Sequence, residues 1–526
     1  MSDSATTPAV LNHSADEREP KAAARIVAHR GRHAEHRGGA RENTLAAIRA
    51  AIDAGATWIE IDVRVTGDGE VVLLHDATLE RLWADPRAVT EVALAELREL
   101  GGGDRRIPLL SEALTVVAGT GATLLIDIDE PTVARPAARV VAADPTGART
   151  AWCGHPDSMR QVRELLPEAQ IWTPWYSTEP PGAPELTGVS LINAQHLLVG
   201  RDFVDAVHAH GVEVAVWTVD DPAQAAHLAR IGVDSITTNE VETVQHALAQ
   251  GTVDERSRQA AVALELAEQA AEQTARARRD GVGSIETKTG PADHVTEVDR
   301  QIERGVRAAL TVQFPEHDVI GEEYGGTGDG HRPCWYLDPV DGTANLANGF
   351  PWTSFSLALV EDGRPVVGVV FDPVGGTIEG TTAPVPVLAV AGQGSWRLGE
   401  RLSVTAPDQH DPLSGALVIT ELDGARAWPG LHELLDALGD RHCTVRIPGS
   451  GTATLAGIAM GRGVAAIIHR YSAMDHAAAA LVVLEAGGAV LDGAGQANPH
   501  PVGSAIIAGA DARAAASLWE QWRAVQ

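Results

Sequence analysis

An alternation of short apolar segments with amphipathic stretches runs through the first half of this 526-residue chain and restricts its fold more than any other feature. The segments with the composition of buried β-strands are 25–31, 58–65, 71–76, 123–129, 150–155, 170–175, 189–195, 213–219 and 234–239. Most of the stretches between them have helical periodicity, and one of these stops at Gly232. Repeated strand-then-helix order favours parallel strands joined by crossover helices. At this length, eight or nine such strands predict a closed (β/α)₈ TIM barrel rather than an open sheet.

The pattern changes close to residue 250. Residues 252–280 form one Ala-, Glu- and Arg-rich stretch with helical periodicity. The remainder mixes strands, helices and Gly-rich turns without strict alternation. We therefore predict a disordered tail over residues 1–23, a barrel over 24–250 and a layered α+β domain over 251–526.

Composition restricts the partners and the compartment. Acidic residues outnumber basic ones 71 to 41, which argues against nucleic acid as a partner but is compatible with divalent cations and, through them, phosphate substrates. The three cysteines (Cys153, Cys334 and Cys443) are dispersed without metal-site spacing, as in a reducing compartment. The first 20 residues lack the features of a signal peptide, and no 18-residue apolar run predicts a membrane span. We expect a cytoplasmic protein.

Carboxylates and histidines stand at the ends of several predicted barrel strands. They are His29, Glu60, Asp62, His75, Asp127 and Asp129. Glu60 and Asp62 are two residues apart on a strand and point to the same face, where two buried carboxylates repel each other unless a divalent cation lies between them. A strand-end histidine or an isolated carboxylate pair is often structural or solvated. The combination favours a catalytic site, because barrel strands bring their carboxyl ends to one face.

Five ordered motifs extend over residues 25–245: "AHRG", "RENTLAAIRAAIDAGATWIEIDV", "VVLLHDATLERL", "IPLLSEAL" and "VWTVDDPAQAAHLARIGVDSITTN". With them the first domain resembles the glycerophosphodiester phosphodiesterase family. The resemblance implies a TIM barrel that cleaves glycerol-containing phosphodiesters with a divalent cation, Mg²⁺ or Ca²⁺. The implied roles are general base for His29, general acid for His75, phosphate binding for Arg30, pocket lining for Trp217, and metal ligation for Glu60, Asp62 and Asp127.

The barrel also departs from that family. Asp127-Ile128-Asp129 stands where a Glu-x-Lys strand is usual, so the metal ligand is one carbon shorter and a phosphate-binding cation is missing. The loop between "HRG" and "ENT" is longer than usual, and a second "HRG" begins at His36. The apolar strand before His29 favours His29 as the catalytic residue. These departures leave open the alternative that the barrel is a degenerate binding or assembly module.

Acidic residues also recur near the ends of predicted elements in the second half. Asp338 and Asp341 lie in the turn of "WYLDPVDGT", and the others are Asp299, Glu322, Glu323 and Asp475. Turn formation or helix capping explains any one of them but not the set. An all-oxygen set without His or Cys predicts Mg²⁺ rather than zinc. The N–H groups of Gly342 and Thr343, where the turn enters a predicted helix, suit phosphate oxygens.

Six further motifs follow in order over residues 255–510: "KTGPADHVTEVD", "FPEHDVIGEE", "LDPVDGTANLANGFPWTSFSLAL", "GVVFDP", "GSGTATLAGIAMGRG" and "MDHAAAALVVLEAGG". This set is similar to the inositol monophosphatase family, whose members are magnesium-dependent, lithium-sensitive phosphatases. The resemblance implies a layered αβαβα domain that holds two or three Mg²⁺ ions and forms homodimers. The implied metal ligands are Glu322, Asp338, the Val340 carbonyl, Asp341 and Asp475, with Glu322 and Thr343 orienting the attacking water. The implied substrate contacts are Lys288, Gly342, Thr343, Gly451, Thr452 and His469.

Two departures weaken the expectation of inositol as the substrate alcohol. Met474 stands where tryptophan is usual, and His469 falls near the position of the glutamate that commonly grips inositol hydroxyls. The main hypothesis is therefore a bifunctional hydrolase for small phosphorylated molecules. The barrel splits a glycerophosphodiester, such as glycerophosphoinositol, and the second domain dephosphorylates the resulting monoester. In the alternative, only the phosphatase is active, on inositol phosphate or another small monophosphate.

Overall fold

The computed structural model describes residues 24–33, 39–282, 285–287, 294–328, 330–378, 381–405 and 408–526. The predicted tail over residues 1–23, the second "HRG" histidine, His36, and the predicted substrate contact Lys288 lie outside the described residues. No helix in the described ranges combines the length and the apolar character that are needed to cross a bilayer.

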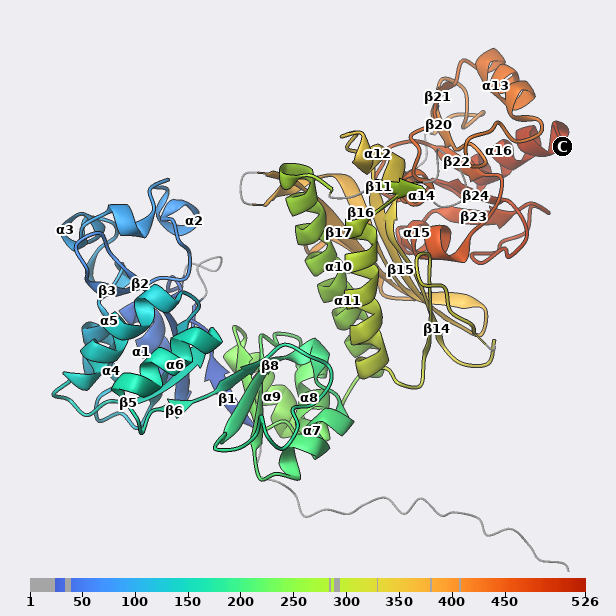
Figure 1. The fold of residues 1–526 in the computed structure, drawn as a ribbon. Helices are drawn as coiled ribbons and strands as arrows, with labels where there is room; N and C mark the ends of the chain where they lie inside the picture. The colour runs from blue at the N-terminus through green and yellow to red at the C-terminus, as the bar shows by residue number, and fades with distance from the viewer. Residues whose placement is uncertain are drawn as a thin grey trace, which may run out of the picture.

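The first half of the chain is a parallel β-barrel surrounded by helices (Figure 1). Its strands are β1 (Arg25–Ala28), β2 (Trp58–Val65), β4 (Thr123–Ile128), β5 (Arg149–Gly154), β6 (Gln170–Ile171), β7 (Thr173–Trp175), β8 (Leu191–Gln195), β9 (Glu213–Trp217) and β10 (Ser235–Thr238). β6 pairs with β5 and β7 pairs with β8, while only Trp172 separates β6 from β7. These two short strands thus form one interrupted barrel strand, which closes the sheet. The predicted TIM barrel is confirmed.

The helices of this domain follow the strands as expected. They are α1 (Leu45–Asp53), α2 (Glu80–Trp83), α3 (Leu94–Leu97), α4 (Leu110–Val117), α5 (Pro131–Ala142), α6 (Pro156–Leu165), α7 (Arg201–His208), α8 (Pro222–Ile231) and α9 (Val241–Gln250), with 3₁₀ turns η2 (Val89–Glu91), η3 (Gly103–Arg105) and η4 (His196–Leu198). Local chemistry sets their ends. In α8, the Asp221 side chain accepts a hydrogen bond from the Gln224 N–H, and Gly232 ends the helix with φ 106°.

One predicted strand is not part of the parallel barrel. β3 (Val71–Leu73) pairs antiparallel with the end of β2, with Leu73 opposite Val63. The connection between the two strands is a tight turn that contains Gly69, whereas a parallel strand requires a long crossover. The expectation of parallel strands throughout was therefore wrong here. The hairpin turns the chain back toward the barrel, and the Leu74 N–H donates to the Asp62 carbonyl at 3.1 Å.

The second half has two sheets. The first contains β13 (Asp318–Gly321), β14 (Cys334–Asp341), β15 (Ser354–Glu361), β16 (Arg364–Ile378), β17 (Thr381–Val390), β18 (Gly394–Arg397) and β19 (Glu400–Arg401), in that spatial order. The second contains, in spatial order, β21 (Thr444–Arg446), β20 (Leu417–Thr420), β22 (Ala465–Ile468), β24 (Ile506–Gly509) and β23 (Ala489–Asp492). A separate hairpin consists of β11 (Ile285–Thr287) and β12 (His294–Thr296).

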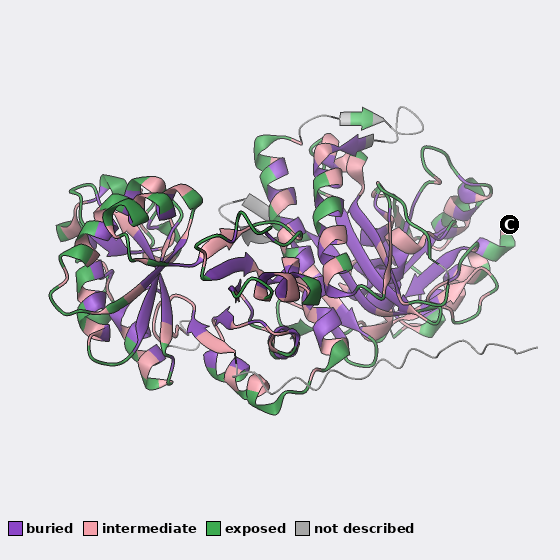
Figure 2. Cartoon of the chain, turned by 60° about the horizontal axis from the view of Figure 1, so that its bottom comes forward, coloured by how far each residue is buried: buried purple, intermediate pink, exposed green. Residues whose placement is uncertain are grey.

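Helices complete five layers in this half (Figure 1). α10 (Glu255–Asp280) and α11 (Glu297–Gln313) cover the outer face of the first sheet, and α14 (Gly451–Ala459) and α15 (Ala473–Glu485) lie between the sheets. α13 (Leu431–Asp440) and α16 (Ala512–Ala524) cover the second sheet, while α12 (Thr343–Ala347) follows β14. The predicted αβαβα architecture is confirmed. Buried strands form the centre of both halves, and the helices expose their polar faces (Figure 2).

A buried glutamine at the end of α11 joins the two halves. The Gln313 Nε2 lies 3.1, 3.1 and 3.2 Å from the carbonyl oxygens of His196, Leu197 and Val199 on the barrel. Its Oε1 accepts a hydrogen bond of 2.9 Å from the Gln224 Nε2. Because buried backbone carbonyls require partners, Gln313 makes the contact between the halves specific.

Candidate functional site

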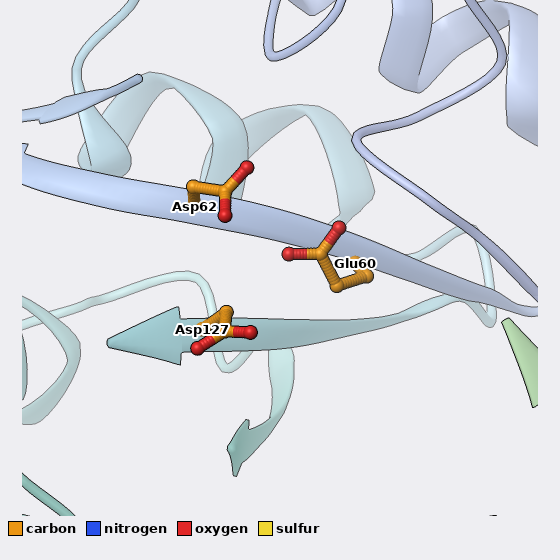
Figure 3. A group of neighbouring side chains, drawn as sticks. All are labelled: Glu60, Asp62 and Asp127. Atoms are coloured by element: carbon orange, nitrogen blue, oxygen red, sulfur yellow. The ribbon is translucent and has the colours of Figure 1, made fainter. Parts of the chain in front are cut away.

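Three carboxylates meet inside the barrel at the carboxyl end of two adjacent strands (Figure 3). Glu60 and Asp62 lie on β2, and Asp127 is the neighbour of Asp62 on β4. One oxygen from each residue lies within 4.8 Å of the others. Burial and the neighbouring carboxylates raise the pKa of Glu60 well above its usual range and that of Asp127 to about 7. The three residues predicted as metal ligands are therefore brought together.

The donor atoms of this triad fit a divalent cation. Among the residues that the structure describes, the Glu60 Oε1 and the Asp127 Oδ1 are buried and find no hydrogen-bond partner. Buried polar atoms are normally paired, and a buried carboxylate without a donor is especially costly. A cation bound by all three residues would satisfy these oxygens and remove the repulsion between the carboxylates.

Arg30 lies directly against this triad. Its backbone N–H donates to the Glu60 Oε2 at 2.8 Å, and its Nε lies 3.1 Å from the Asp62 Oδ2. Its Nη1 also donates to the Glu42 Oε1 at 3.0 Å. Arg30 therefore stands where a phosphate group bound to a cation in the triad would meet a guanidinium, although here its contacts are to carboxylates.

Asn239 determines which nitrogen of His29 carries the proton. The His29 Nδ1 lies 2.7 Å from the Asn239 Oδ1. Asn239 is itself oriented by Asp220, which accepts from the Asn239 N–H and from its Nδ2, each at 2.7 Å. Since the amide oxygen faces the ring, the His29 Nδ1 must donate, and the Nε2 keeps a lone pair. That Nε2 lies 3.8 Å from the Glu60 Oε2, so the basic nitrogen faces the carboxylate triad.

Burial and the positive charge of Arg30 lower the pKa of His29, which keeps its ring neutral. A second imidazole, from His33 in the lengthened loop, places its Nε2 2.9 Å from the same Asn239 oxygen. Sequence reasoning missed Asn239, Asp220 and His33. The polar ending of the strand segment "DSITTN" was the available signal for Asn239.

His75 is held by a chain of ion pairs. Its Nδ1 lies 2.7 Å from the Asp76 Oδ1, and Arg81 donates to the Asp76 Oδ2 at 2.6 Å and to the Glu42 Oε1 at 2.6 Å. Burial raises the pKa of Glu42, but hydrogen bonds from Arg81 and Arg30 outweigh this effect and lower the pKa to about 2. His75 also lies close enough to Asp127 to influence its pKa. The chain therefore joins His75 to the triad through Glu42 and Arg30.

Two aromatic residues lie at the same end of the barrel. Trp217 is the last residue of β9 and is half-buried. Tyr176 follows β7 and is 64% exposed; partial desolvation of the ring, together with the charges of Asp127 and Asp129, raises its pKa. Tyr176 was not predicted from the sequence, because nothing in its surroundings distinguishes it from an ordinary loop residue.

The acidic residues of the second half also converge. Asp338 is buried on β14, where burial and the nearby carboxylates of Glu322, Asp475 and Asp341 raise its pKa well above the usual range. Burial and Asp475 raise the pKa of Asp341 to about 6. Glu322 directly follows β13, and its N–H donates to the Leu337 carbonyl on β14 at 3.2 Å. These four carboxylates are thus neighbours in space.

This cluster is more open than the barrel triad. Within the described ranges, Glu60, Asp62 and Asp127 each place one oxygen within 4.8 Å of the others. In the same ranges, no three carboxylates of the second cluster approach one another this closely. Repulsion between carboxylates opposes a closer approach in the absence of cations. A set of hard oxygen donors with strongly raised carboxyl pKa values fits Mg²⁺.

A threonine and an aspartate form a hydrogen-bonded pair beside this cluster. The Thr343 Oγ1 lies 2.9 Å from both the Asp299 Oδ1 and the Val340 carbonyl oxygen. Asp299 is fully buried, and the Thr296 N–H donates to its Oδ2 at 2.9 Å. Asp299, one of the acidic residues noted in the sequence, therefore contacts the "DPVDGT" loop through Thr343.

The start of α14 closes around Asp341. The Asp341 Oδ2 accepts from the Ser450 Oγ at 2.8 Å and from the Thr452 N–H at 2.6 Å. The Thr452 Oγ1 donates to the Asp475 carbonyl at 2.6 Å. At Gly451 a Cβ atom would lie 2.4 Å from the His476 Nε2, so only glycine permits this approach. Gly451 and Thr452 therefore lie at the carboxylate cluster, as do Ser450 and His476, which sequence reasoning missed.

Glu421 supports this loop from behind. Its Oε2 accepts from the Gly449 N–H at 2.9 Å and its Oε1 from the Thr454 Oγ1 at 2.6 Å. Burial raises the pKa of Glu421 to about 7. His469, in contrast, stacks on Trp428 with ring centroids 4.9 Å apart, at the hydrophobic cluster beneath α13 and α16. Its predicted contact with substrate stays a prediction.

Comparisons with known proteins agree with the two sets of motifs. Residues 255–523 match the model of the "Inositol monophosphatase family", and residues 29–243 match that of the "Glycerophosphoryl diester phosphodiesterase family". Among curated relatives, inositol monophosphatase 2 of Solanum lycopersicum is 35% identical over 39% of this chain and 77% of its own length. Inositol monophosphatase 2 of Rattus norvegicus is 32% identical over 45% of this chain and 80% of its own length.

Two solved structures are similar to separate halves of the chain. SuhB of Mycobacterium tuberculosis is 28% identical, covers 52% of this chain and 99% of its own, and superposes with a TM-score of 0.40. A phosphodiesterase of Oleispira antarctica, solved in complex with the product sn-glycerol-3-phosphate, is 25% identical and covers 43% of this chain and 97% of its own, with a TM-score of 0.39.

Proposed function

Because this chain belongs to the inositol monophosphatase family and carries a glycerophosphoryl diester phosphodiesterase domain in front of it, we propose that it is a bifunctional metal-dependent hydrolase. The barrel cleaves a glycerophosphodiester, such as glycerophosphoinositol, and the second domain dephosphorylates the phosphomonoester that results. The observation that carries the proposal is the Glu60–Asp62–Asp127 triad. Within the described part of the chain, its Glu60 Oε1 and Asp127 Oδ1 are buried without a partner, and its Glu60 Oε2 lies 3.8 Å from the basic nitrogen of His29.

In the barrel, Glu60, Asp62 and Asp127 would hold a divalent cation, which supplies Lewis-acid polarisation of the phosphodiester and offsets its charge. The His29 Nε2 accepts a proton from the attacking water as the oxygen of that water bonds to phosphorus. His75, oriented through its Nδ1 by Asp76, donates a proton to the leaving alkoxide as the ester P–O bond breaks. Arg30 is placed to bind a non-bridging phosphate oxygen, and Trp217 lines the pocket.

In the second domain, Glu322, Asp338, the Val340 carbonyl, Asp341 and Asp475 would hold Mg²⁺ ions, which supply charge neutralisation and a more acidic water. The Thr343 hydroxyl donates a hydrogen bond to Asp299, and its oxygen accepts a hydrogen bond from the attacking water. Glu322 orients the same water. As the water oxygen bonds to phosphorus, the P–O bond to the alcohol breaks, and the proton that the water loses ends on the departing alkoxide oxygen. The N–H groups of Gly342 and Thr343 bind phosphate oxygens.

Product analysis tests the order of the two reactions. Full-length protein is incubated with glycerophosphoinositol and MgCl₂, and phosphorus NMR follows the products. Wild-type protein should release inorganic phosphate, whereas Asp338→Asn should accumulate the monoester. His29→Ala should leave the diester intact but still hydrolyse added inositol phosphate. Absence of cleavage across a broad panel of glycerophosphodiesters would contradict the role of the barrel.

A second candidate function keeps only the phosphatase active, with the barrel as a binding or assembly module. The Asp127-Ile128-Asp129 sequence favours it, because the exposed Asp129 replaces a phosphate-binding cation with an anion. Calorimetric titration of Mn²⁺ into the Asp338→Asn variant and into the Asp338→Asn/Asp127→Asn double variant separates the two candidate functions. The module is favoured if Asp127→Asn removes no metal site.

A further inference from the structure

A cavity of about 680 Å³ lies between the two domains, lined by residues outside both candidate catalytic sites. The barrel contributes the start of α7, the end of α8 and residues Thr178 and Pro180, while the end of α11 contributes Thr311 to Gln313. The domains approach closely at its edge, since a Cβ atom on Gly200 would lie 3.1 Å from the Val312 Cγ1. This interdomain cavity is therefore built by both halves of the protein.

The walls of the interdomain cavity carry positive charge, in a protein whose formal net charge is −30. Arg201 and Arg230 line it, and among the described residues neither pairs with a carboxylate; the polar contact of Arg230 is the His227 Nδ1 at 3.5 Å. An arginine that is not held in an ion pair can bind the phosphate of a ligand through its fork of N–H donors. Two such arginines on one cavity wall indicate a site for an anion.

The two carboxylates at the cavity do not neutralise these arginines. Asp202 is the direct sequence neighbour of Arg201 in α7, and adjacent helical residues point about 100° apart. The Glu316 side chain is 92% exposed and lies 3.8 Å from an Arg332 nitrogen, so it is turned toward solvent.

A third guanidinium lies behind the wall. Arg258 of α10 is buried, with its Nη2 bound to the Glu255 Oε1 at 2.7 Å and to the Gln313 carbonyl at 3.0 Å. Its Nη1 is buried without a hydrogen-bond partner. After burial, the charges of Arg258, Arg230 and Arg201, in that order, lower the pKa of His227 to about 3. Arg201 and Arg230 therefore give the cavity wall its positive potential, with Arg258 behind them in an ion pair with Glu255, whereas the His227 ring is neutral.

Other donors at the cavity suit a tetrahedral oxyanion. Thr178 brings a hydroxyl group, and α7 begins at Gly200, where no side chain caps the first N–H groups. Guanidinium pairs bind the several acceptor oxygens of phosphate better than isolated ammonium groups do. The volume leaves room for a polyol attached to the phosphate.

We propose that the interdomain cavity is a binding site for a small phosphate ester, separate from both catalytic sites, in which Arg201 and Arg230 hold the phosphate. Because Gln313 borders the cavity and also binds the carbonyls of η4, an occupant contacts the residue that docks the domains. The ligand therefore stabilises the docked arrangement as well as binding to it.

Calorimetric titrations of the full-length protein in EDTA test this site. Without cations the catalytic carboxylates repel phosphate, so binding in EDTA reports sites that do not depend on metal. Inositol 1-phosphate and inorganic phosphate should both bind wild-type protein, and inositol should not. Arg201→Gln/Arg230→Gln should weaken both phosphate ligands by about tenfold per arginine. A higher affinity for inositol 1-phosphate than for inorganic phosphate identifies the ester as the ligand.

The matched control is Arg160→Gln/Arg163→Gln, which removes two exposed arginines from α6 and should bind like wild type. Both double variants should keep wild-type hydrolysis of inositol 1-phosphate in Mg²⁺, which shows that they fold. Ligand should also raise the thermal midpoint of wild-type protein but not of Arg201→Gln/Arg230→Gln. Equal affinity in wild-type protein and Arg201→Gln/Arg230→Gln, or no binding to wild-type protein, would overturn the proposal.

Discussion

The Asn239 Oδ1 accepts a hydrogen bond from the His29 Nδ1 at 2.7 Å, although the two residues are 210 positions apart in the chain. They follow β1 and β10, the first and last strands of the barrel, which pair in parallel and close it. Closure of the barrel therefore also sets the tautomer of the candidate base. Partners that orient a catalytic histidine in this way are as important to the reaction as the histidine's position.

Replacing Asn239 should impair diester cleavage without removing the metal site. We expect Asn239→Ala to lower kcat/KM for a glycerophosphodiester by about 10- to 100-fold, because His29 loses its fixed tautomer. Steady-state kinetics and Mn²⁺ titration measure the two effects separately. Hydrolysis of inositol phosphate by the same sample is the internal control. An unchanged diesterase rate would show that Asn239 does not orient the base.

Removing one carboxylate from the barrel triad should stabilise the metal-free protein. Burial, Asp62 and Asp129 raise the pKa of Asp127 to about 7, so above this pH its ionised form opposes folding. In EDTA at pH 8, Asp127→Asn should raise the free energy of unfolding by about 1–3 kcal/mol, measured by urea denaturation. Mg²⁺ should then stabilise the variant less than it stabilises wild type. A less stable Asp127→Asn protein in EDTA would argue against carboxylate repulsion at this site.

Glu421 should make stability depend on pH. Its pKa is raised from 4.5 to about 7 by burial, so the folded protein holds a proton that the unfolded chain releases. The stability that this proton adds to the folded protein is fully present below about pH 4.5 and is lost as the pH rises through about 7. Relative to wild type, Glu421→Gln should gain about 1–3 kcal/mol between pH 5 and pH 8. Urea denaturation at both pH values measures this difference, and parallel pH profiles would contradict the assignment.

The Thr343–Asp299 pair should affect only the phosphatase reaction. Thr343→Val keeps the shape of the side chain but removes the hydroxyl that contacts Asp299 and the Val340 carbonyl. We expect kcat for inositol phosphate to fall about 100-fold or more, as for loss of a general-base contact. Asp299→Asn should have an effect of similar size. Diester cleavage by both variants should stay at the wild-type rate, and a decrease there would point to general unfolding instead.

The docking of the two domains should depend on Gln313. Gln313→Ala removes the amide donor from the carbonyls of Leu197 and Val199 and from that of His196, which still accepts from the Val199 N–H; the loss costs about 1–3 kcal/mol. We expect faster proteolytic cleavage in residues 251–254, between α9 and α10, and separate unfolding transitions for the two domains. Gln301→Ala, at an exposed position of the same helix, is the control. Equal cleavage of both variants would show that other contacts suffice.

Much of the fold could be predicted from local patterns. The apolar alternation of residues 58–65 matches β2 in full, and the two-residue spacing of Glu60 and Asp62 places both on one face of it. The start and end of α8 follow from Asp221, Pro222 and Gly232. The strand at residues 71–76 was also predicted, but its direction was not, because its composition is that of any buried strand and its antiparallel pairing follows from the tight turn that joins it to β2.

The sequence by itself determined most of the elements, the order of the two domains and most of the candidate acidic ligands, because side-chain periodicity, capping residues and motif spacing act over a few neighbouring positions. Only the tertiary structure decided that Asn239 orients His29, that Glu421 supports the loop at Asp341, and that Arg201 and Arg230 share a cavity with α11. These contacts join residues far apart in the chain. They exist only after the barrel closes and the second domain docks, so no local pattern records them.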